Sequence, residues 1–217
     1  MAGAGDAYCE RAEKFIKKYF REYQIIAGKW GEPYPKKIGL WKGDYIISYL
    51  SPWIIKKSIL KRAKIASINF HSGPPEYPGV GCYNFAMYNN EKAYGVTCHH
   101  MNPKVDTGKI IAVKKFPLNK NDTIYSMTQK TYKHIHSLFY DIMDVIIKGK
   151  KLPEAKINWK KKPYNTHKLN KLCKITPDMD RKEIKKRIKA VTFPNKPGAY
   201  IEIAGIKFRY SNKDRLI

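Results

Sequence analysis

The stretch KIASINFHSGPP, residues 64–75, joins an apolar run to a polar loop. Its first half is typical of the end of a buried strand, and the glycine and two prolines after His71 end that strand. Because side chains alternate along a strand, Asn69 and His71 point to one side and Phe70 points to the other. We therefore expect an amide and an imidazole together at the carboxyl end of a strand, where open α/β sheets place ligand sites.

A carboxylate follows the next strand-like run, residues 95–101. Asp106 lies there on a turn that contains Gly108. Each of these polar residues alone is more often structural, since Asn and Asp are common in turns and a single His is usually part of the packing. Together, Asn69, His71 and Asp106 predict a site at one edge of the sheet.

Apolar periodicity predicts an alternation of strands and helices over residues 1–149. Strands are expected at 23–27, 45–50, 64–71, 93–101 and 109–116. Helices are expected at 6–20, 52–60, 82–89 and 123–148. This alternation is typical of an α/β fold with a mostly parallel, doubly wound sheet.

The composition changes after Gly149. Residues 150–176 are basic and polar, a short helix is expected near 179–189, and residues 201–208 alternate around an Ala-Gly turn that is typical of a hairpin. We therefore divide the chain into a core, 1–149, and an extension, 150–217, which is basic and aromatic and contains a short helix and a C-terminal β-hairpin.

The net charge of +25 comes from 43 Lys and Arg residues against 18 Asp and Glu residues. Such a charge fits an RNA-binding surface or the attraction of a small anionic substrate. Because the lysines are spread through the sequence, we favour solvated lysines with some steering of anions. A partner that carries phosphate is expected, and nucleic acid is not required.

The cysteine pattern and the hydropathy indicate a cytoplasmic protein. The four cysteines form no C-x-x-C pair, which suits a reducing compartment. No apolar run approaches the roughly 18 residues that would span a bilayer, and no signal peptide is visible, so no membrane partner is expected.

His99 and His100, beside Cys98, suggest a metal site at first sight. Adjacent residues on a strand face opposite sides, so the two imidazoles cannot easily share one ion. Cys98 and His100 could face the same way, but two ligands make a poor zinc site. We expect no metal.

Four segments, in this order and at this spacing, resemble the formyltransferases that use 10-formyltetrahydrofolate. They are DYIIS at 44–48, INFHS at 68–72, GVT at 95–97 and DTGKII at 106–111. The resemblance runs from about residue 44 to residue 118. It implies the formyltransferase fold, with a first strand that is short or absent because the sequence starts close to the first helix. It also implies 10-formyltetrahydrofolate as co-substrate.

The resemblance implies that Asn69, His71 and Asp106 form the catalytic set. The Asn69 amide can donate to an oxyanion without titrating. His71 can donate to the oxyanion or accept the amine proton, and Asp106 can orient His71 or carry the proton itself. The resemblance also implies a folate site made by Tyr49, Leu50, Ser51, Trp53, Ile54 and Asp106.

The C-terminal part resembles that of formyltransferases acting on nucleotide-linked amino sugars. This implies a dTDP-linked 4-amino-4,6-dideoxy sugar as acceptor, used for O-antigen, lipopolysaccharide or other surface polysaccharide. Three sets of residues are expected at the acceptor: Pro75, Tyr77 and Tyr83 around the sugar, Lys162 and Lys168 (or Arg187) at the phosphates, and Tyr164, Phe193 or Tyr200 at the base.

Two alternatives to sugar formylation remain open. One is a glycinamide ribonucleotide formyltransferase, which has a similar length and the same core motif. The other is an RNA-binding protein on a formyltransferase-like core, which the charge suggests. The apolar residues of the hairpin, Ile201, Ile203, Ile206 and Phe208, also predict a homodimer.

Overall fold

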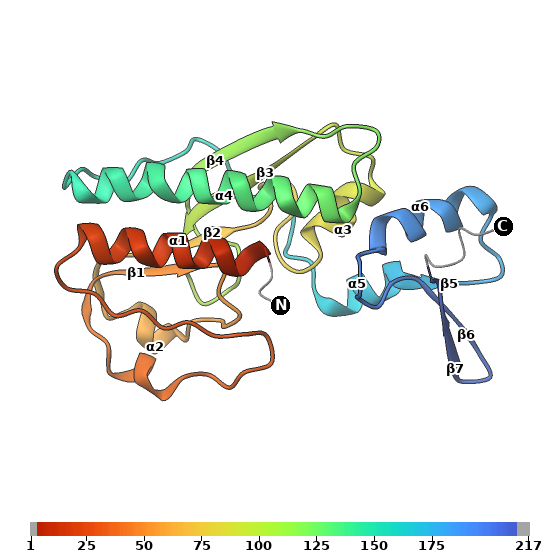
Figure 1. The fold of residues 1–217 in the computed structure, drawn as a ribbon, viewed down its shortest axis with the longest axis horizontal. Helices are drawn as coiled ribbons and strands as arrows, with labels where there is room; N and C mark the ends of the chain where they lie inside the picture. Colours follow the sequence, from red (N-terminus) through yellow and green to blue (C-terminus); the bar gives the residue numbers. More distant parts are fainter. Residues whose placement is uncertain (1–3, 212–217) are drawn as a thin grey trace.

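A four-stranded sheet forms the centre of the computed structural model, which describes residues 4–211 (Figure 1). Its strands lie in the order β1 (Gly43–Tyr49), β2 (Ala63–His71), β3 (Ala93–His100) and β4 (Ile110–Pro117). β1 and β2 are parallel, whereas β2/β3 and β3/β4 are antiparallel. The α/β class is confirmed, and the parallel direction holds for the β1/β2 pair.

Short connections explain the two antiparallel pairs. Nine residues, 101–109, link β3 to β4, so the chain returns as a hairpin. Between β2 and β3 the only helix is α3 (Cys82–Tyr88), which has seven residues. The chain therefore re-enters the sheet at the end where β2 left it, which makes β3 antiparallel to β2.

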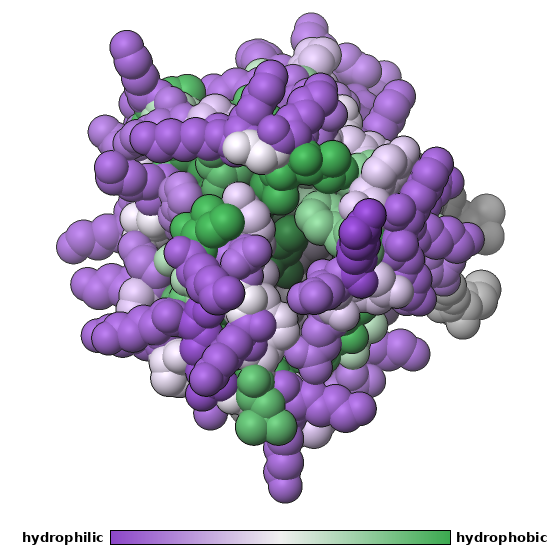
Figure 2. Space-filling model, turned by 90° about the vertical axis from the view of Figure 1, so that its left-hand side faces the viewer, coloured by the Kyte–Doolittle hydropathy of each residue, from purple (hydrophilic) through white to green (hydrophobic). Residues whose placement is uncertain are grey.

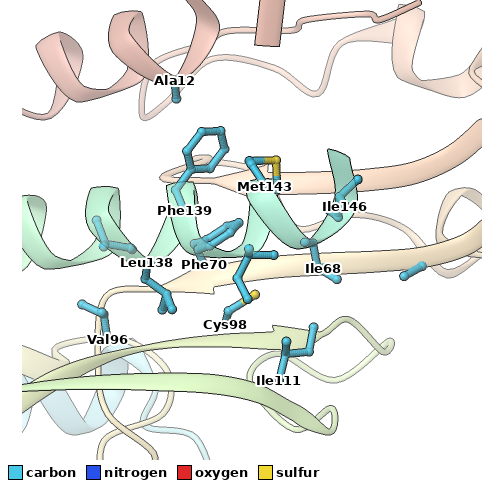
Figure 3. Packing of buried hydrophobic residues seen from close by; sticks show 13 residues of the cluster. Ala12, Ile68, Phe70, Val96, Cys98, Ile111, Leu138, Phe139, Met143 and Ile146 are labelled. Carbon is cyan, nitrogen blue, oxygen red and sulfur yellow. The ribbon is translucent and has the colours of Figure 1, made fainter. Parts of the chain in front are cut away.

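Two long helices cover one face of the sheet (Figure 1). They are α1 (Ala4–Tyr19) and α4 (Ile124–Ile147). Thr123 caps α4 in a capping box with Ser126, in which each side chain accepts from the other residue's backbone amide. Figure 3 shows the apolar side chains of α4 packing onto those of β2, β3 and β4, with Phe70 beside Phe139 at a ring distance of 5.6 Å. Strand alternation thus buries Phe70 under α4 and leaves Asn69 and His71 on the opposite face.

Two elements differ from the sequence-based expectation. Residues 23–27 form no strand, because they are largely exposed and have no neighbouring strand to pair with; a 3-10 helix, η1 (Lys36–Leu40), follows them. The helix expected at 52–60 is reduced to α2 (Lys57–Leu60). Leu50 has a positive φ of 50°, and the Trp53 indole donates to the Glu32 carbonyl, so the chain between them is held as a loop.

The C-terminal part forms a second, smaller layer beside α3 (Figure 1). Its elements are α5 (Thr166–Cys173), β5 (Lys174–Ile175), α6 (Arg181–Val191), β6 (Tyr200–Ile203) and β7 (Ile206–Arg209). The expected hairpin is confirmed as β6 and β7, and β5 adds a parallel strand to it. Ala204 and Gly205 have φ values of 50° and 78°, as a two-residue hairpin turn requires.

Residues 150–165 connect these two parts and lie against the sheet. The Ala155 amide donates to the Ile110 carbonyl, and Leu152 packs on the core. Contacts therefore cross the boundary expected at Gly149, and the division into 1–149 and 150–217 stays a prediction. Residues 1–3, where a first strand would precede α1, lie outside the described residues.

Basic side chains are spread over the surface. Figure 2 shows one end of the molecule covered mainly by hydrophilic side chains, around a smaller apolar hollow. Several lysines form exposed ion pairs, such as Lys17 with Glu13 and Lys148 with Asp144. Within residues 4–211, no helix has both the length and the apolar composition to cross a membrane.

The loop after β2, residues 72–81, is held by the backbone of residues 160–164. Lys160 donates its amide to the Pro75 carbonyl, and Tyr164 donates to the Pro78 carbonyl, each at 2.9 Å. Tyr164 in turn accepts from the Val80 amide at 3.0 Å. Gly79 has a φ of +87°, and a Cβ there would collide with the Tyr164 backbone, so only glycine fits.

We expect Gly79→Ala to lower the free energy of unfolding more than the control Gly149→Ala. Gly149 also has a positive φ, of 62°, but nothing lies near its Cβ position, so its substitution costs about 1–2 kcal/mol of backbone strain alone. Gly79→Ala also disrupts two hydrogen bonds, which adds roughly 2 kcal/mol. Denaturant unfolding measures both, and equal losses would show that the loop contact contributes nothing.

Candidate active site

Four polar side chains meet at the edge of the sheet where β2 ends. Asp106 lies between two imidazoles: its Oδ2 is 3.2 Å from His71 Nδ1, and its Oδ1 is 3.2 Å from His99 Nε2. The Asn69 amide nitrogen is 3.2 Å from the same His99 nitrogen. His71, His99 and Asp106 are 7%, 2% and 4% exposed. The structure thus brings Asn69, His71 and Asp106 together and adds His99.

Strand register explains this convergence. Asn69 pairs with His99 and His71 pairs with Thr97 across the β2/β3 ladder, so Asn69 and His99 are direct cross-strand neighbours. The sequence interpretation considered His99 only as a metal ligand and missed this role. Its position two residues after Thr97, on the same strand face, is the signal that could have identified it.

The loop at residues 101–109 delivers Asp106. Its φ of 47° lies in the left-handed region, which Asp adopts more easily than most residues. The Met101 amide donates to the Ser67 carbonyl, and the Thr107 hydroxyl donates within the loop to Asn102 Oδ1. These bonds fix the loop against β2 and direct the Asp106 carboxylate inward.

The loop at residues 72–81 forms hydrogen bonds with both members of the His71–Asp106 pair. The Gly79 amide donates to Asp106 Oδ2 at 2.8 Å. His71 Nε2 lies 3.0 Å from the Tyr77 carbonyl, and because a carbonyl only accepts, Nε2 carries the hydrogen. Nδ1 is therefore the nitrogen of His71 that faces the carboxylate and changes its protonation state.

Tyr77 is anchored from three sides. Its hydroxyl donates to Glu91 at 2.5 Å and accepts from the Asn89 amide at 2.8 Å, and its ring stacks on Tyr164. Tyr77 was expected near the sugar; the structure buries its side chain and directs its carbonyl to His71. Tyr77 thereby fixes the orientation of the imidazole.

Burial and charge act in opposite directions on the two acid–base groups. Burial, the largest effect, lowers the pKa of His71 below its ordinary 6.5, although the Asp106 charge and the Tyr77 carbonyl raise it. Burial alone would raise the pKa of Asp106, but His71, His99 and the Gly79 amide hold it below its usual 3.8. Asp106 is therefore ionised at neutral pH and stabilises any proton that His71 gains.

Trp159 covers the two imidazoles. Its ring makes edge contacts with His99 and His71, at centroid distances of 5.1 and 5.8 Å. Its Nε1 donates to the Gly108 carbonyl at 2.7 Å, which ties the connecting segment to the Asp106 loop. Sequence reasoning missed Trp159 because no local pattern links it to Gly108, His99 or His71, which lie more than 50 positions earlier.

The residues expected to bind folate form a stretch at the end of β1. Tyr49 pairs with Phe70 in parallel register, so the chain from Leu50 onward leaves the sheet at the edge where His71 lies. The Tyr49 hydroxyl contacts His136 of α4 at 3.2 Å, and burial raises its pKa. Ser51 accepts from the Trp53 amide, and Ile54 is exposed.

The residues expected at the acceptor are dispersed. Pro75 is buried, and Tyr83 of α3 packs against Tyr94 of β3. Tyr164 stacks on Phe85 at 3.9 Å, with the Lys168 ammonium 5.4 Å above its ring. The others are placed as follows: Phe193 against Tyr125, Tyr200 on β6, Arg187 paired with Glu183, and Lys162 at a cavity beside Trp159.

Two imidazoles and a carboxylate in contact could suggest a metal ligand set. Here they bond to one another and to backbone groups instead. Over residues 4–211, no group of three or more His, Cys, Asp or Glu side chains is arranged to hold a metal ion. The arrangement is suited to proton transfer and hydrogen-bond donation.

Comparisons with known proteins identify similarity to formyltransferases. A model of the formyl transferase family matches residues 33–143. A methionyl-tRNA formyltransferase from Lactobacillus johnsonii is 29% identical over 167 residues, which cover 76% of this chain and 52% of that protein. The chain spans about half of that relative's length, and 17% and 35% of two other curated relatives.

Solved structures share the fold. A 4-N formyltransferase from Francisella tularensis is 24% identical with a TM-score of 0.65, over 77% of this chain and 69% of that one. An N-formyltransferase from Helicobacter canadensis, in complex with folinic acid and dTDP-3-aminofucose, is 26% identical with a TM-score of 0.57, over 74% and 59% of the two chains. The expected formyltransferase fold is confirmed.

We expect the pKa of His71, followed by NMR of the imidazole signals, to lie below 6.5 and to fall further in Asp106→Asn. The substitution removes the negative charge that raises the pKa of His71, and Asn tolerates the left-handed φ of this position. The exposed His167 on α5 provides a reference imidazole signal in the same spectra. An unchanged His71 pKa in the variant would contradict the coupling.

Proposed function

The chain belongs to the formyl transferase family, and on this basis we propose that it transfers a formyl group from 10-formyltetrahydrofolate to the amino group of a nucleotide-linked amino sugar. The observation that carries the proposal is the buried contact of Asp106 with His71 and His99, next to Asn69. These groups supply what formyl transfer to an amine requires: a proton acceptor and a neutral hydrogen-bond donor.

The co-substrate supplies an activated formyl group. The amine nitrogen bonds to its carbon and loses a proton, and the bond to the folate nitrogen breaks as that nitrogen gains a proton. Nδ1 of His71, the nitrogen beside Asp106, takes the amine proton and passes a proton to the leaving folate nitrogen, because the Tyr77 carbonyl retains the hydrogen on Nε2. Asp106 stabilises the resulting imidazolium, and Asn69 donates its amide hydrogen to the oxygen that gains negative charge.

The nucleotide-linked sugar is favoured by two observations. The Helicobacter canadensis relative was solved with dTDP-3-aminofucose. In addition, the net charge of +25 attracts a doubly charged diphosphate. In its more specific form, this proposal names a dTDP-linked 4-amino-4,6-dideoxy sugar as the acceptor. The product would then serve the synthesis of O-antigen or other surface polysaccharide.

Formylation of methionyl-tRNA is the second candidate. It is favoured by the 29% identity to the Lactobacillus johnsonii enzyme over 76% of this chain. The same positive charge would suit a tRNA phosphate backbone. Since both candidates share the catalytic groups, the acceptor distinguishes them.

We also propose that the hairpin forms a homodimer. Ile203, Ile206 and Phe208 are 57%, 61% and 53% exposed. β7 has β6 as its one neighbour among the described strands, which leaves its other edge open. Apolar side chains on an unpaired edge favour association with a second copy.

The test of function is a turnover assay with 10-formyltetrahydrofolate and a panel of amines. The panel contains dTDP-linked 3-amino and 4-amino sugars, methionyl-tRNA and glycinamide ribonucleotide. We expect the highest kcat/KM with a nucleotide-linked amino sugar. Preference for methionyl-tRNA would favour the second candidate. RNA binding that falls steeply with salt, without turnover of any amine, would contradict an enzymatic role.

Variants of the catalytic groups test the assigned roles in this assay. His71→Ala and Asp106→Asn should lower kcat by roughly 10²- to 10⁴-fold, and Asn69→Ala by about 10²- to 10³-fold. His167→Ala, an exposed histidine of α5, is the matched control and should retain full activity. Circular dichroism checks the fold, and near-normal turnover in His71→Ala would overturn the assignment.

We expect Phe208→Asp to shift the protein from dimer to monomer in gel filtration with light scattering. The charge would be buried in an apolar interface, which is unfavourable. Tyr23→Asp is the control, since Tyr23 is a similarly exposed aromatic residue (48%) outside the hairpin. A monomeric wild-type protein at high concentration, or a dimeric Phe208→Asp variant, would contradict the hairpin interface.

A further inference from the structure

A cavity of about 630 Å³ lies beside the catalytic cluster, on the outer side of Trp159. Its walls come from the Asp106 loop and from the segment that connects the two parts of the chain. They include Trp159, Thr107, Lys104, Lys160, Lys161 and Lys162, and no acidic residue. The cavity is therefore strongly positive, because the successive residues Lys160–Lys162 and the more distant Lys104 all line it.

These four lysines gather at one cavity with no carboxylate to compensate their charges within residues 4–211, whereas several other surface lysines are paired. Lys109 pairs with Glu154, and Lys115 pairs with Glu76. Within residues 4–211, none of the four cavity lysines has a carboxylate partner in ion-pair distance. Like charges held close together repel each other, and an anion between them removes that repulsion.

One of the four ammonium groups, that of Lys161, makes cation–π contacts with two tyrosine rings. The Lys161 ammonium lies 4.8 Å from the centroid of Tyr77 and 6.0 Å from that of Tyr164. The Lys160 backbone is bonded to the Pro75 carbonyl. The lysine run is therefore attached to the same loop that holds His71, which gives the cavity wall a defined position.

Trp159 is a wall shared by the cavity and the catalytic cluster. One edge of its ring contacts His99 and His71, and it also lines the cavity. Thr107 lines the cavity directly after Asp106 in the sequence. The cavity therefore lies directly beside the residues expected to hold the reacting groups.

We propose that this cavity binds the paired anionic groups of a substrate, through ammonium contacts from Lys104 and residues 160–162. The inference rests on the proposed function, since both proposed substrates carry such a pair. Folate has two glutamate carboxylates, and the nucleotide-linked sugar has a diphosphate. Lysine ammonium groups recognise either as point charges.

Steady-state kinetics distinguish the two sources. The variant carries Lys160→Gln, Lys161→Gln and Lys162→Gln; the matched control carries Lys150→Gln, Lys151→Gln and Lys156→Gln, three exposed lysines that do not line the cavity. We expect the cavity variant to raise KM about tenfold for one substrate with kcat within threefold, and the control to leave both unchanged. A rise for folate identifies the carboxylates, and a rise for the sugar identifies the diphosphate.

A binding measurement separates failure of this proposal from failure of the proposed function. Calorimetry uses inorganic pyrophosphate and p-aminobenzoylglutamate as probes and needs no turnover. We expect one probe to bind the wild type and the control, and to bind the cavity variant about tenfold more weakly. Lys104→Gln, on a separate loop, should weaken binding about threefold. Equal affinity in all proteins, or no binding of either probe to the wild type, overturns the proposal whether or not any amine is formylated.

Discussion

The Asp106 carboxylate is the group on which the arrangement of this molecule depends. It is almost completely buried, and a buried carboxylate is tolerated only where hydrogen bonds and opposite charges replace its water. Its partners are His71 on β2, His99 on β3 and the Gly79 amide in the loop between these strands. The strand register, the loop and the connecting segment must all be correct for these bonds to form together.

The features that could be predicted from the sequence are those set by neighbouring residues in the chain, such as strand alternation and turn type. Alternation along residues 64–71 places Phe70 in the core and Asn69 with His71 on the other face, and the Ala204-Gly205 turn specifies the hairpin. Features that depend on distant partners were not predictable in this way. Residues 23–27 have strand-like composition but no strand to pair with. Trp159 reaches the imidazoles only because residues 150–164 lie across the sheet.

The antiparallel entry of β3 also explains why His99 was missed. The Asn69–His99 pair exists only in this register, since a shift by one residue would turn His99 to the helix-covered face. The spread of lysines through the sequence likewise concealed the cavity. Lys104 is more than 50 residues from the Lys160–Lys162 run, and the chain brings them together by closing the Trp159 indole onto the Gly108 carbonyl.

The hydrogen bonds between residues 75–80 and 160–164 also bear on the order in which the protein matures during synthesis. The segments that carry Asn69, His71 and Asp106 leave the ribosome well before Tyr164 does. Until Tyr164 has emerged, the loop that fixes His71 lacks its supporting backbone, because the contact spans more than 80 residues. A nascent chain therefore has its acid–base residues early but gains a rigid catalytic centre only when the connecting segment has folded onto the sheet.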